Sequence, residues 1–115
     1  MSTRRGPRRR LALCGAALTS VLGAWAAWAA DIPTVTQANR KFQPPQIEVA
    51  RGGTVRFVND DGQLTHHIYT TSPAFDFDSG EQEPGKIVEE RFTVPGTYTV
   101  LCGIHPKMRL VVTVR

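Results

Sequence analysis

Three side chains that can bind a metal lie within seven residues near the end of the sequence. They are the thiol of Cys102, the imidazole of His105 and the thioether of Met108, spaced Cys-x2-His-x2-Met. A loop of this length can fold all three groups around one point. Sulfur and imidazole are soft and borderline ligands, the set that suits copper in both of its common oxidation states. The loop is therefore a candidate copper site that needs one more ligand.

Two adjacent histidines upstream, His66 and His67, could supply that ligand. They open a β-branched and aromatic segment that predicts a strand, in which neighbouring side chains point to opposite faces. His66 shares its face with Ile68, which favours His66 as the inward histidine, although alternation alone leaves His67 open. Two histidines and one cysteine in a plane, with a weak axial methionine, form a site for one-electron copper chemistry. The alternative is an ordinary hairpin with a buried cysteine, an exposed histidine and a core methionine.

Short alternating segments separated by turn signals must position these residues. Strands are expected within 46–50, 54–58, 66–71, 86–94, 97–102 and 110–115, with an extended segment at 42–45. Residues 31–40 indicate a connector or a ragged first strand, and residues 74–85 a surface excursion with little regular structure. This pattern predicts an all-β fold, an antiparallel sandwich or barrel of about seven to eight strands, in one domain over 30–115.

Residues 1–29 have the pattern of a secretory signal peptide. Five arginines lie in the first ten residues, an apolar stretch runs from Leu11 to about Ala27, and small residues at Ala27 and Ala29 fit cleavage after Ala29. An uncleaved membrane anchor is the alternative, because 11–30 is about long enough to span a bilayer. Arg9-Arg10 also permits a twin-arginine signal. In each case the domain lies outside the cytoplasm, and we expect a periplasmic protein.

Cleavage would remove Cys14 and leave Cys102 as the one cysteine of an exported chain. A lone cysteine in an oxidising compartment cannot form an internal disulfide. It is a free thiol, an intermolecular link or a ligand, and binding a metal would protect it.

The charge distribution argues against a nucleic-acid partner. The formal net charge of the whole chain is +4, but from Ala30 onward there are nine Lys/Arg and ten Asp/Glu. The basic character therefore belongs to the leader, and the domain has no basic stripe.

The loop and its upstream partner resemble one family. Gly96-Thr97-Tyr98 followed by Cys102-Gly103-Ile104-His105-Pro106-Lys107-Met108 is similar to the copper-binding end of small blue copper proteins, the cupredoxins. The short loop with proline after its histidine is most similar to the amicyanin and plastocyanin-like type. The segment 53–59, then His66-His67-Ile68, resembles the family's Gly-x-x-Val-x-Phe-x-Asn followed by His-Asn-Val/Ile. The resemblance covers about Val35 to Arg115.

The resemblance implies a Greek-key β-sandwich with one type 1 copper. It gives ligand roles to His66, Cys102, His105 and, in the axial position, Met108. It also implies that Asn59 ties the ligand-bearing loops together. The chain departs from the family at His67, where an asparagine usually braces the cysteine loop, and at Gly103, where a hydroxyl residue is frequent. Hydrogen bonds around a metal site tune it, so both departures bear on the reduction potential.

These features predict a carrier that shuttles single electrons between redox proteins, of the cytochrome c, dehydrogenase or oxidase kind, as a monomer and without enzyme activity. Four protein ligands leave no open position for a substrate. His105 is the expected electron port, with Ile104 and Pro106 as a small docking patch. A periplasmic copper chaperone or store is the alternative. Such a protein is expected to have Met-rich or His-rich tracts, whereas this sequence has two methionines and three histidines.

Overall fold

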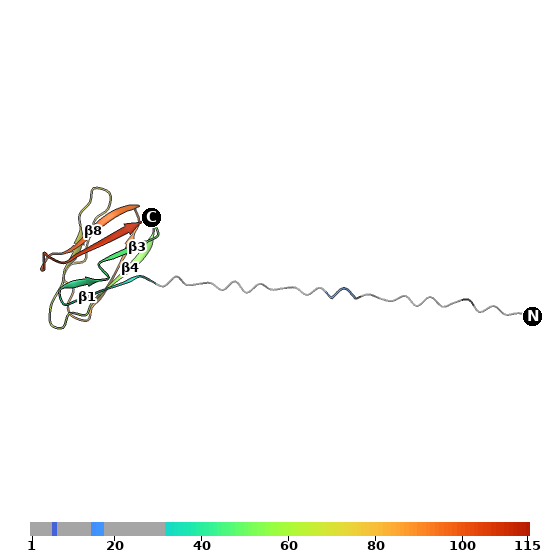
Figure 1. Ribbon diagram of the computed structural model, residues 1–115, viewed down its shortest axis with the longest axis horizontal. Helices are drawn as coiled ribbons and strands as arrows, with labels where there is room; N and C mark the ends of the chain where they lie inside the picture. Colours follow the sequence, from blue (N-terminus) through green and yellow to red (C-terminus); the bar gives the residue numbers. More distant parts are fainter. Residues whose placement is uncertain (1–5, 7–14, 18–31) are drawn as a thin grey trace, which may run out of the picture.

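The computed structural model describes Gly6, residues 15–17 and residues 32–115. The described part of the chain holds nine strands and no helix (Figure 1): β1 (Thr34–Ala38), β2 (Lys41–Gln43), β3 (Gln46–Val49), β4 (Gly53–Asn59), β5 (Ile68–Thr70), β6 (Phe77–Asp78), β7 (Ile87–Phe92), β8 (Gly96–Cys102) and β9 (Arg109–Val114). A helix long and apolar enough to cross a bilayer does not occur among these residues. The predicted signal peptide and its cleavage point lie almost entirely outside them.

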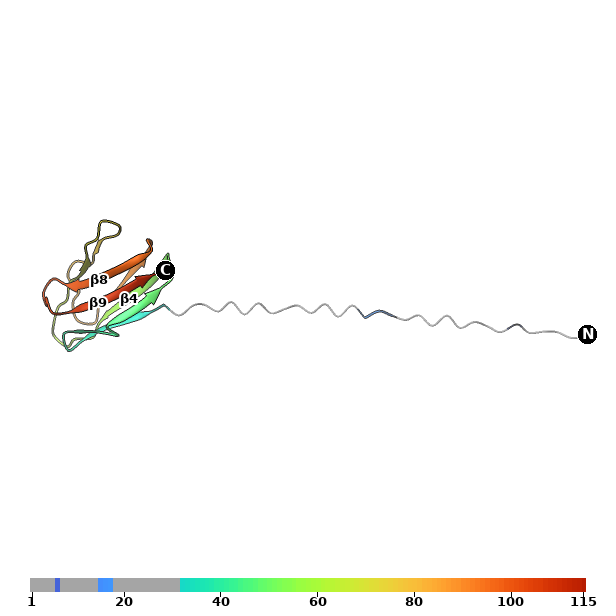
Figure 2. The same ribbon diagram turned by 45° about the horizontal axis from the view of Figure 1, so that its top comes forward.

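The strands form two sheets that enclose one core (Figure 2), so the predicted all-β sandwich is confirmed. One sheet has the order β2-β1-β4-β7 and the other β3-β9-β8-β5-β6. Two pairs, β1 with β4 and β3 with β9, are parallel, while the other pairs are antiparallel. These parallel pairs were not expected. They arise because the chain crosses from one sheet to the other after β2, at Pro44-Pro45, and each of β1 and β3 joins a strand that runs in its own direction.

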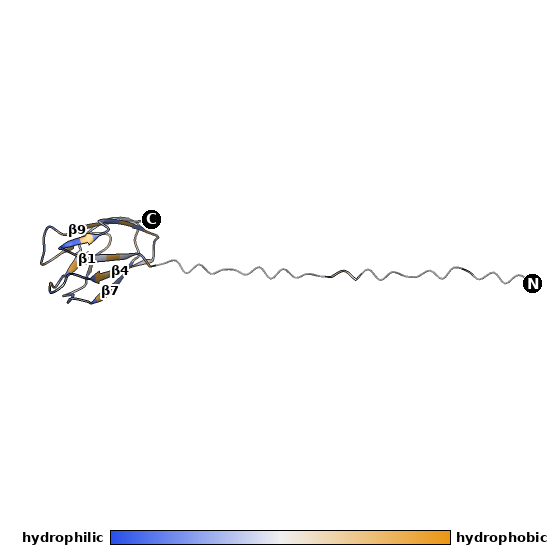
Figure 3. Ribbon diagram, turned by 60° about the horizontal axis from the view of Figure 1, so that its bottom comes forward, coloured by the Kyte–Doolittle hydropathy of each residue, from blue (hydrophilic) through white to orange (hydrophobic). Residues whose placement is uncertain are grey.

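Alternating side chains fill the space between the sheets, and Figure 3 shows hydrophobic residues on strands of both. The predicted inward series of β8 and β9 are confirmed: Tyr98, Val100, Cys102, Leu110, Val112 and Val114 are all buried. Opposite them, Val55 and Phe57 of β4 are 0% exposed. Burying a side chain of this size stabilises the fold by about 1.5–3 kcal/mol. Cys102 thus ends its strand with its side chain inside the core.

The segment 31–40 is more regular than expected, because β1 is a well-formed central strand. Its inner face alternates Val35 and Gln37, both 0% exposed. The strand was not predicted with certainty because Gln37 is polar, and a polar residue at an inward position interrupts the apolar alternation that indicates a strand.

The acidic excursion 74–85 also packs more closely than expected. Phe75 and Phe77 lie against the core, with ring centroids 5.2 and 5.7 Å from that of Phe92. Gln82 is 0% exposed, and its main chain pairs with His66 in both directions. The excursion therefore covers one side of the region where the metal-binding residues were predicted.

Candidate metal centre

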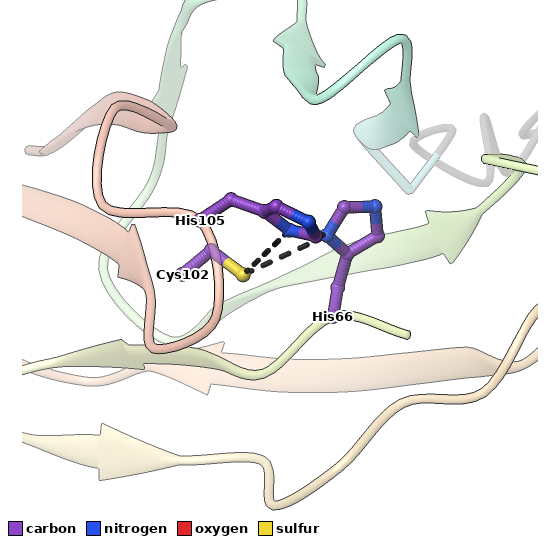
Figure 4. Close-up of side chains that lie close together, drawn as sticks. All are labelled: His66, Cys102 and His105. Atoms are coloured by element: carbon purple, nitrogen blue, oxygen red, sulfur yellow. Dashed lines mark hydrogen bonds between the residues drawn. The ribbon is translucent and has the colours of Figure 1, made fainter. Parts of the chain in front are cut away.

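Three of the four predicted ligands meet at one end of the sandwich, away from the C-terminus (Figures 1 and 4). Sγ of Cys102 lies 3.6 Å from Nδ1 of His66 and 3.7 Å from Nδ1 of His105, and the two Nδ1 atoms are 3.1 Å apart. His66 and Cys102 are buried, and His105 is partly exposed. The two histidines are 39 residues apart in sequence, so the fold creates this cluster.

The triangle of donor atoms has the size that one metal ion requires. Bonds of about 2.0 Å to imidazole nitrogen and 2.3 Å to thiolate sulfur are typical of a metal ion such as zinc with this donor set. At trigonal or tetrahedral angles such bonds place sulfur and nitrogen about 3.5–3.7 Å apart and two nitrogens about 3.3–3.5 Å apart. The separations above lie close to these values. The donor set of one thiol and two imidazoles therefore fits copper in both chemistry and size.

His66 is fixed at both its main chain and its ring. Its N–H donates to Gln82 O at 3.0 Å, and its carbonyl accepts the Gln82 N–H at 2.6 Å. On the far side of the ring, Nε2 lies 2.9 Å from Oδ2 of Asp61, which turns Nδ1 towards Cys102. Sequence reasoning identified His66 as the inward histidine, but it missed Asp61 and Gln82.

Asp61 is held in place by the turn between β1 and β2. Its Oδ1 accepts the N–H of Asn39 at 2.9 Å, and its Oδ2 accepts the N–H of Arg40 at 2.8 Å. Burial opposes ionisation, but these two N–H groups and the ring of His66 outweigh it and hold the pKa of Asp61 below its ordinary value. The carboxylate is therefore charged where it meets His66.

Asn59 connects the loop before His66 to the acidic excursion, whereas the family resemblance implied a tie between the ligand-bearing loops themselves. Its Nδ2 donates to Leu64 O and to Gln82 O, each at 2.8 Å, and its Oδ1 accepts the N–H of Asp61. The side chain of Gln82 continues the network, because its Nε2 donates to Phe57 O and Lys86 O. A local sequence signal for Gln82 is absent, because its partners come from β1, β4 and the residue before β7.

Cys102 is held against β5 through main-chain bonds. It pairs with Ile68 across the sheet, and its Sγ accepts the N–H of His67 at 3.5 Å. The N–H of Gly103 donates to His67 O at 2.8 Å. The start of the loop, which has no hydroxyl side chain at position 103, is thus tied to the residue before β5 by a backbone bond.

The ring of His67 points away from the cluster and pairs with Asp78. It lies over Gly103, where an added Cβ would be 3.6 Å from the imidazole. The sequence left open which of the two histidines points inward. In the structure His66 faces Cys102, and His67 lies on the partly exposed side.

His105 and Met108 complete the loop. The N–H of Met108 donates to His105 O at 3.0 Å, which closes a turn, and Met108 is 1% exposed. Burial, followed by the nearby His66 and Arg40, lowers the pKa of His105. This shift favours the neutral imidazole, which has a lone pair available for a metal.

A surface pocket opens beside His105. It is lined by the loop residues Ile104, His105, Pro106, Lys107 and Met108, by Arg40 of the β1–β2 turn and by Lys41 at the start of β2. Ile104 is 46% exposed, which makes it one of the few large hydrophobic side chains at the described surface. The pocket joins an apolar centre to three cations.

Comparison with known proteins gives the same picture as the geometry. Residues 32–115 match the family model described as copper binding proteins, plastocyanin/azurin family. Amicyanin-alpha of Methylorubrum extorquens is 29% identical over 75 residues, which are 63% of this chain and 62% of that relative. The chain thus matches somewhat less than two thirds of that protein's length.

Solved structures with the same fold include a reduced Cu(I) form of an amicyanin variant. It matches with a TM-score of 0.68 and 25% identity over 74% of this chain and 83% of that one. A copper-containing nitrite reductase from Thermus scotoductus matches with a TM-score of 0.67 and 29% identity, but over only 22% of its own length. The likeness to that enzyme is thus limited to one part of it. With a family match over most of its length and a donor cluster that fits one copper ion, the chain belongs to the plastocyanin/azurin family of copper-binding proteins.

Proposed function

We propose that this protein is an exported electron carrier whose single type 1 copper would be held by His66, Cys102, His105 and Met108. The observation that carries the proposal is the donor triangle, whose three ligand atoms lie within 4.8 Å of one another with two of the residues buried. When bound there, copper supplies reversible one-electron chemistry. The protein supplies a prearranged ligand set, so little rearrangement accompanies a change of oxidation state.

The surroundings of the site favour a carrier over an enzyme. His66 is 0% exposed and Met108 is 1% exposed, so the buried side of the site offers no room for a substrate. Catalytic metal sites keep a position open for water or substrate. The partly exposed ring of His105 is the route for electrons between the metal and the surface.

The pocket beside His105 is proposed as the docking face. Ile104 and Pro106 give it an apolar centre, and Arg40, Lys41 and Lys107 give it positive charge. Three of the nine cations that follow Ala30 thus gather in a domain whose net charge is about −1. Charge complementarity steers encounter, so the expected partner is a redox protein that presents carboxylates around an apolar spot. A small interface of this kind suits a transient, monomeric shuttle.

The leader supports export. Its arginines, its apolar stretch and the small residues before Asp31 fit a signal peptide cleaved after Ala29, which would deliver residues 30–115 to the periplasm. An uncleaved leader would instead tether the domain to the membrane. The mass of the exported protein, measured by mass spectrometry, distinguishes a cleaved leader from an uncleaved one.

Spectroscopy of the Cu(II)-loaded protein tests the carrier. An intense thiolate-to-copper band in the visible spectrum, with narrow copper hyperfine coupling in the EPR spectrum, is the expected result. The Cys102→Ser variant removes the thiolate and is expected to lose the band. A pale spectrum of nitrogen and oxygen ligation in the unmodified protein would contradict the proposal and favour a copper-handling role.

A further inference from the structure

The carboxylate of Asp61 lies at the point where the metal-binding region meets the β1–β2 turn. It accepts the N–H groups of Asn39 and Arg40 and lies 2.9 Å from Nε2 of His66. Its side chain is 10% exposed, and that of His66 is fully buried. Among the described residues, the contact joins a buried imidazole to a carboxylate that the solvent barely reaches.

The turn that holds Asp61 has an unusual backbone. Asn39 and Arg40 both have positive φ values, 52° and 55°. Asparagine tolerates this left-handed region, but arginine seldom adopts it. Two successive left-handed residues form the turn that suits a two-residue β-hairpin, and here they direct the N–H groups of Asn39 and Arg40 towards one point. The carboxylate of Asp61 occupies this point, so the strained turn and the carboxylate stabilise each other.

Contact with a carboxylate decides which nitrogen of His66 carries the proton. Because the carboxylate accepts hydrogen bonds from two main-chain N–H groups, it is ionised and can only accept from Nε2 as well. The proton of the neutral ring is therefore on Nε2, and Nδ1 presents its lone pair to Cys102 Sγ at 3.6 Å. A ligand histidine must have this tautomer to bind a metal through Nδ1.

We infer that Asp61 is a positioning residue that fixes the tautomer of His66 and lowers the reduction potential of the copper. The part concerning the potential rests on the proposed function. A carboxylate hydrogen-bonded to Nε2–H makes Nδ1 a stronger electron donor. A stronger donor and a nearby negative charge both favour the more highly charged Cu(II) over Cu(I), and this difference lowers the potential.

The tautomer is tested without metal and without a variant. Nitrogen NMR of the ¹⁵N-labelled, metal-free protein in alkaline buffer distinguishes a protonated ring nitrogen from a bare one. The expected result is that His66 has its proton on Nε2, in a slowly exchanging N–H. A proton on Nδ1, or rapid exchange between the two tautomers, would overturn the inference whether or not the protein carries electrons.

The potential is tested with two variants of equal charge change. Asp61→Asn removes the carboxylate that contacts His66, and Asp60→Asn removes its exposed neighbour, for which the structure records no side-chain hydrogen bond. Voltammetry of the copper-loaded proteins is expected to show a higher potential for Asp61→Asn and nearly the original potential for Asp60→Asn, because solvent screens an exposed charge. Equal shifts, or no shift in Asp61→Asn, would overturn the role in the potential. If the unmodified, copper-loaded protein lacked the intense thiolate-to-copper band, the proposed function would be contradicted. The result of the tautomer measurement would still stand.

Discussion

The main-chain N–H of His67 lies 3.5 Å from Sγ of Cys102 and donates to it, while the ring of the same residue faces the other way and pairs with Asp78. The two histidines thus contact Cys102 in different ways: His66 through its ring and His67 through its main-chain N–H. A thiolate that accepts an N–H is stabilised in its charged form. Because the main chain makes this bond, the side chain at position 67 is free to vary.

Replacing His67 therefore has little effect on the site. His67→Asn keeps the N–H that contacts Cys102 and loses the pair with Asp78. We expect the visible band and EPR spectrum of the Cu(II)-loaded variant to match those of the original protein. The matched change His66→Asn is expected to abolish the band. If the His67 variant loses its colour and the His66 variant keeps it, the ligand assignment is reversed.

Asn59 is expected to matter for the stability of the fold. Asn59→Ala leaves the carbonyl of Leu64 and the N–H of Asp61 without their side-chain partner, while Gln82 O keeps its bond from the N–H of His66. An unsatisfied buried polar group costs about 1–3 kcal/mol, so we expect the free energy of unfolding of the metal-free protein to fall by about 2 kcal/mol or more. Chemical denaturation measures this change.

A control in the same loop makes the Asn59 result specific. Gln63 is exposed, and the structure records no hydrogen bond of its side chain. Gln63→Ala is therefore expected to leave the free energy of unfolding within about 0.5 kcal/mol of the original value. Equal losses in the two variants would contradict a special role for Asn59.

The candidate ligands could be named from the sequence because three of them are neighbours in the chain. Cys102, His105 and Met108 lie within one loop, so their residue types and spacing are visible without a fold. His66 needed more, because alternation only favoured it over His67 and the family resemblance strengthened that choice. The strands were predictable for the same reason, because the alternation of apolar and polar residues is visible within each short segment.

Asp61, Gln82 and Gln37 could not be predicted, because their contacts join distant segments. Asp61 contacts Asn39 and Arg40 across more than 20 residues, and Gln37 donates to Gln82 across 45. A polar residue at a buried position has no periodic signature, and its hydrogen-bond partners depend on how the strands pair. The parallel pairing of β1 with β4 is likewise a property of the whole fold.

The metal-free protein is expected to lose stability in acid. Burial, with His66 and Arg40 nearby, lowers the pKa of His105 below 6.5. The folded protein therefore binds this proton less tightly than the unfolded chain does. The contribution of His105 is complete above pH 6.5 and declines as the pH falls through that value.

Asp61 also stabilises the folded protein less as the pH falls, but at a lower pH than His105. Its pKa is lowered from 3.8 by its hydrogen bonds, so its contribution is present above that value and is lost as the pH falls through the lower folded pKa. The raised pKa of the partly buried Glu90 acts in the opposite direction. We expect the melting temperature of the metal-free protein to decline in two steps, the first below about pH 6.5 and the second below about pH 4.

Replacing His105 tests the first step. His105→Gln removes the titrating group and is expected to flatten the decline in melting temperature between about pH 6.5 and pH 5, while leaving the decline below about pH 4 in place. A melting temperature of the original protein that stays constant or rises as the pH falls through this range would contradict the assignment.

The cations around His105 are expected to control the rate of electron transfer to anions. Lys41→Glu and Lys107→Glu reverse charges that line the pocket, whereas Arg51→Glu makes the same change in the exposed turn before β4. The probe is hexacyanoferrate(III), which oxidises the Cu(I)-loaded protein and is followed by stopped-flow absorbance. Each pocket variant is expected to react roughly 3- to 10-fold more slowly at low salt.

Ionic strength provides the second readout. Attraction between the pocket and an anion is screened by salt, so the original protein is expected to react more slowly as salt is added. The pocket variants should show a weaker dependence on salt, and Arg51→Glu should behave much like the original protein. If all three variants slow equally, net charge alone governs the encounter and the pocket is not the docking face. If only the pocket variants change, the route for electrons leads through the surface where Lys41 and Lys107 flank His105.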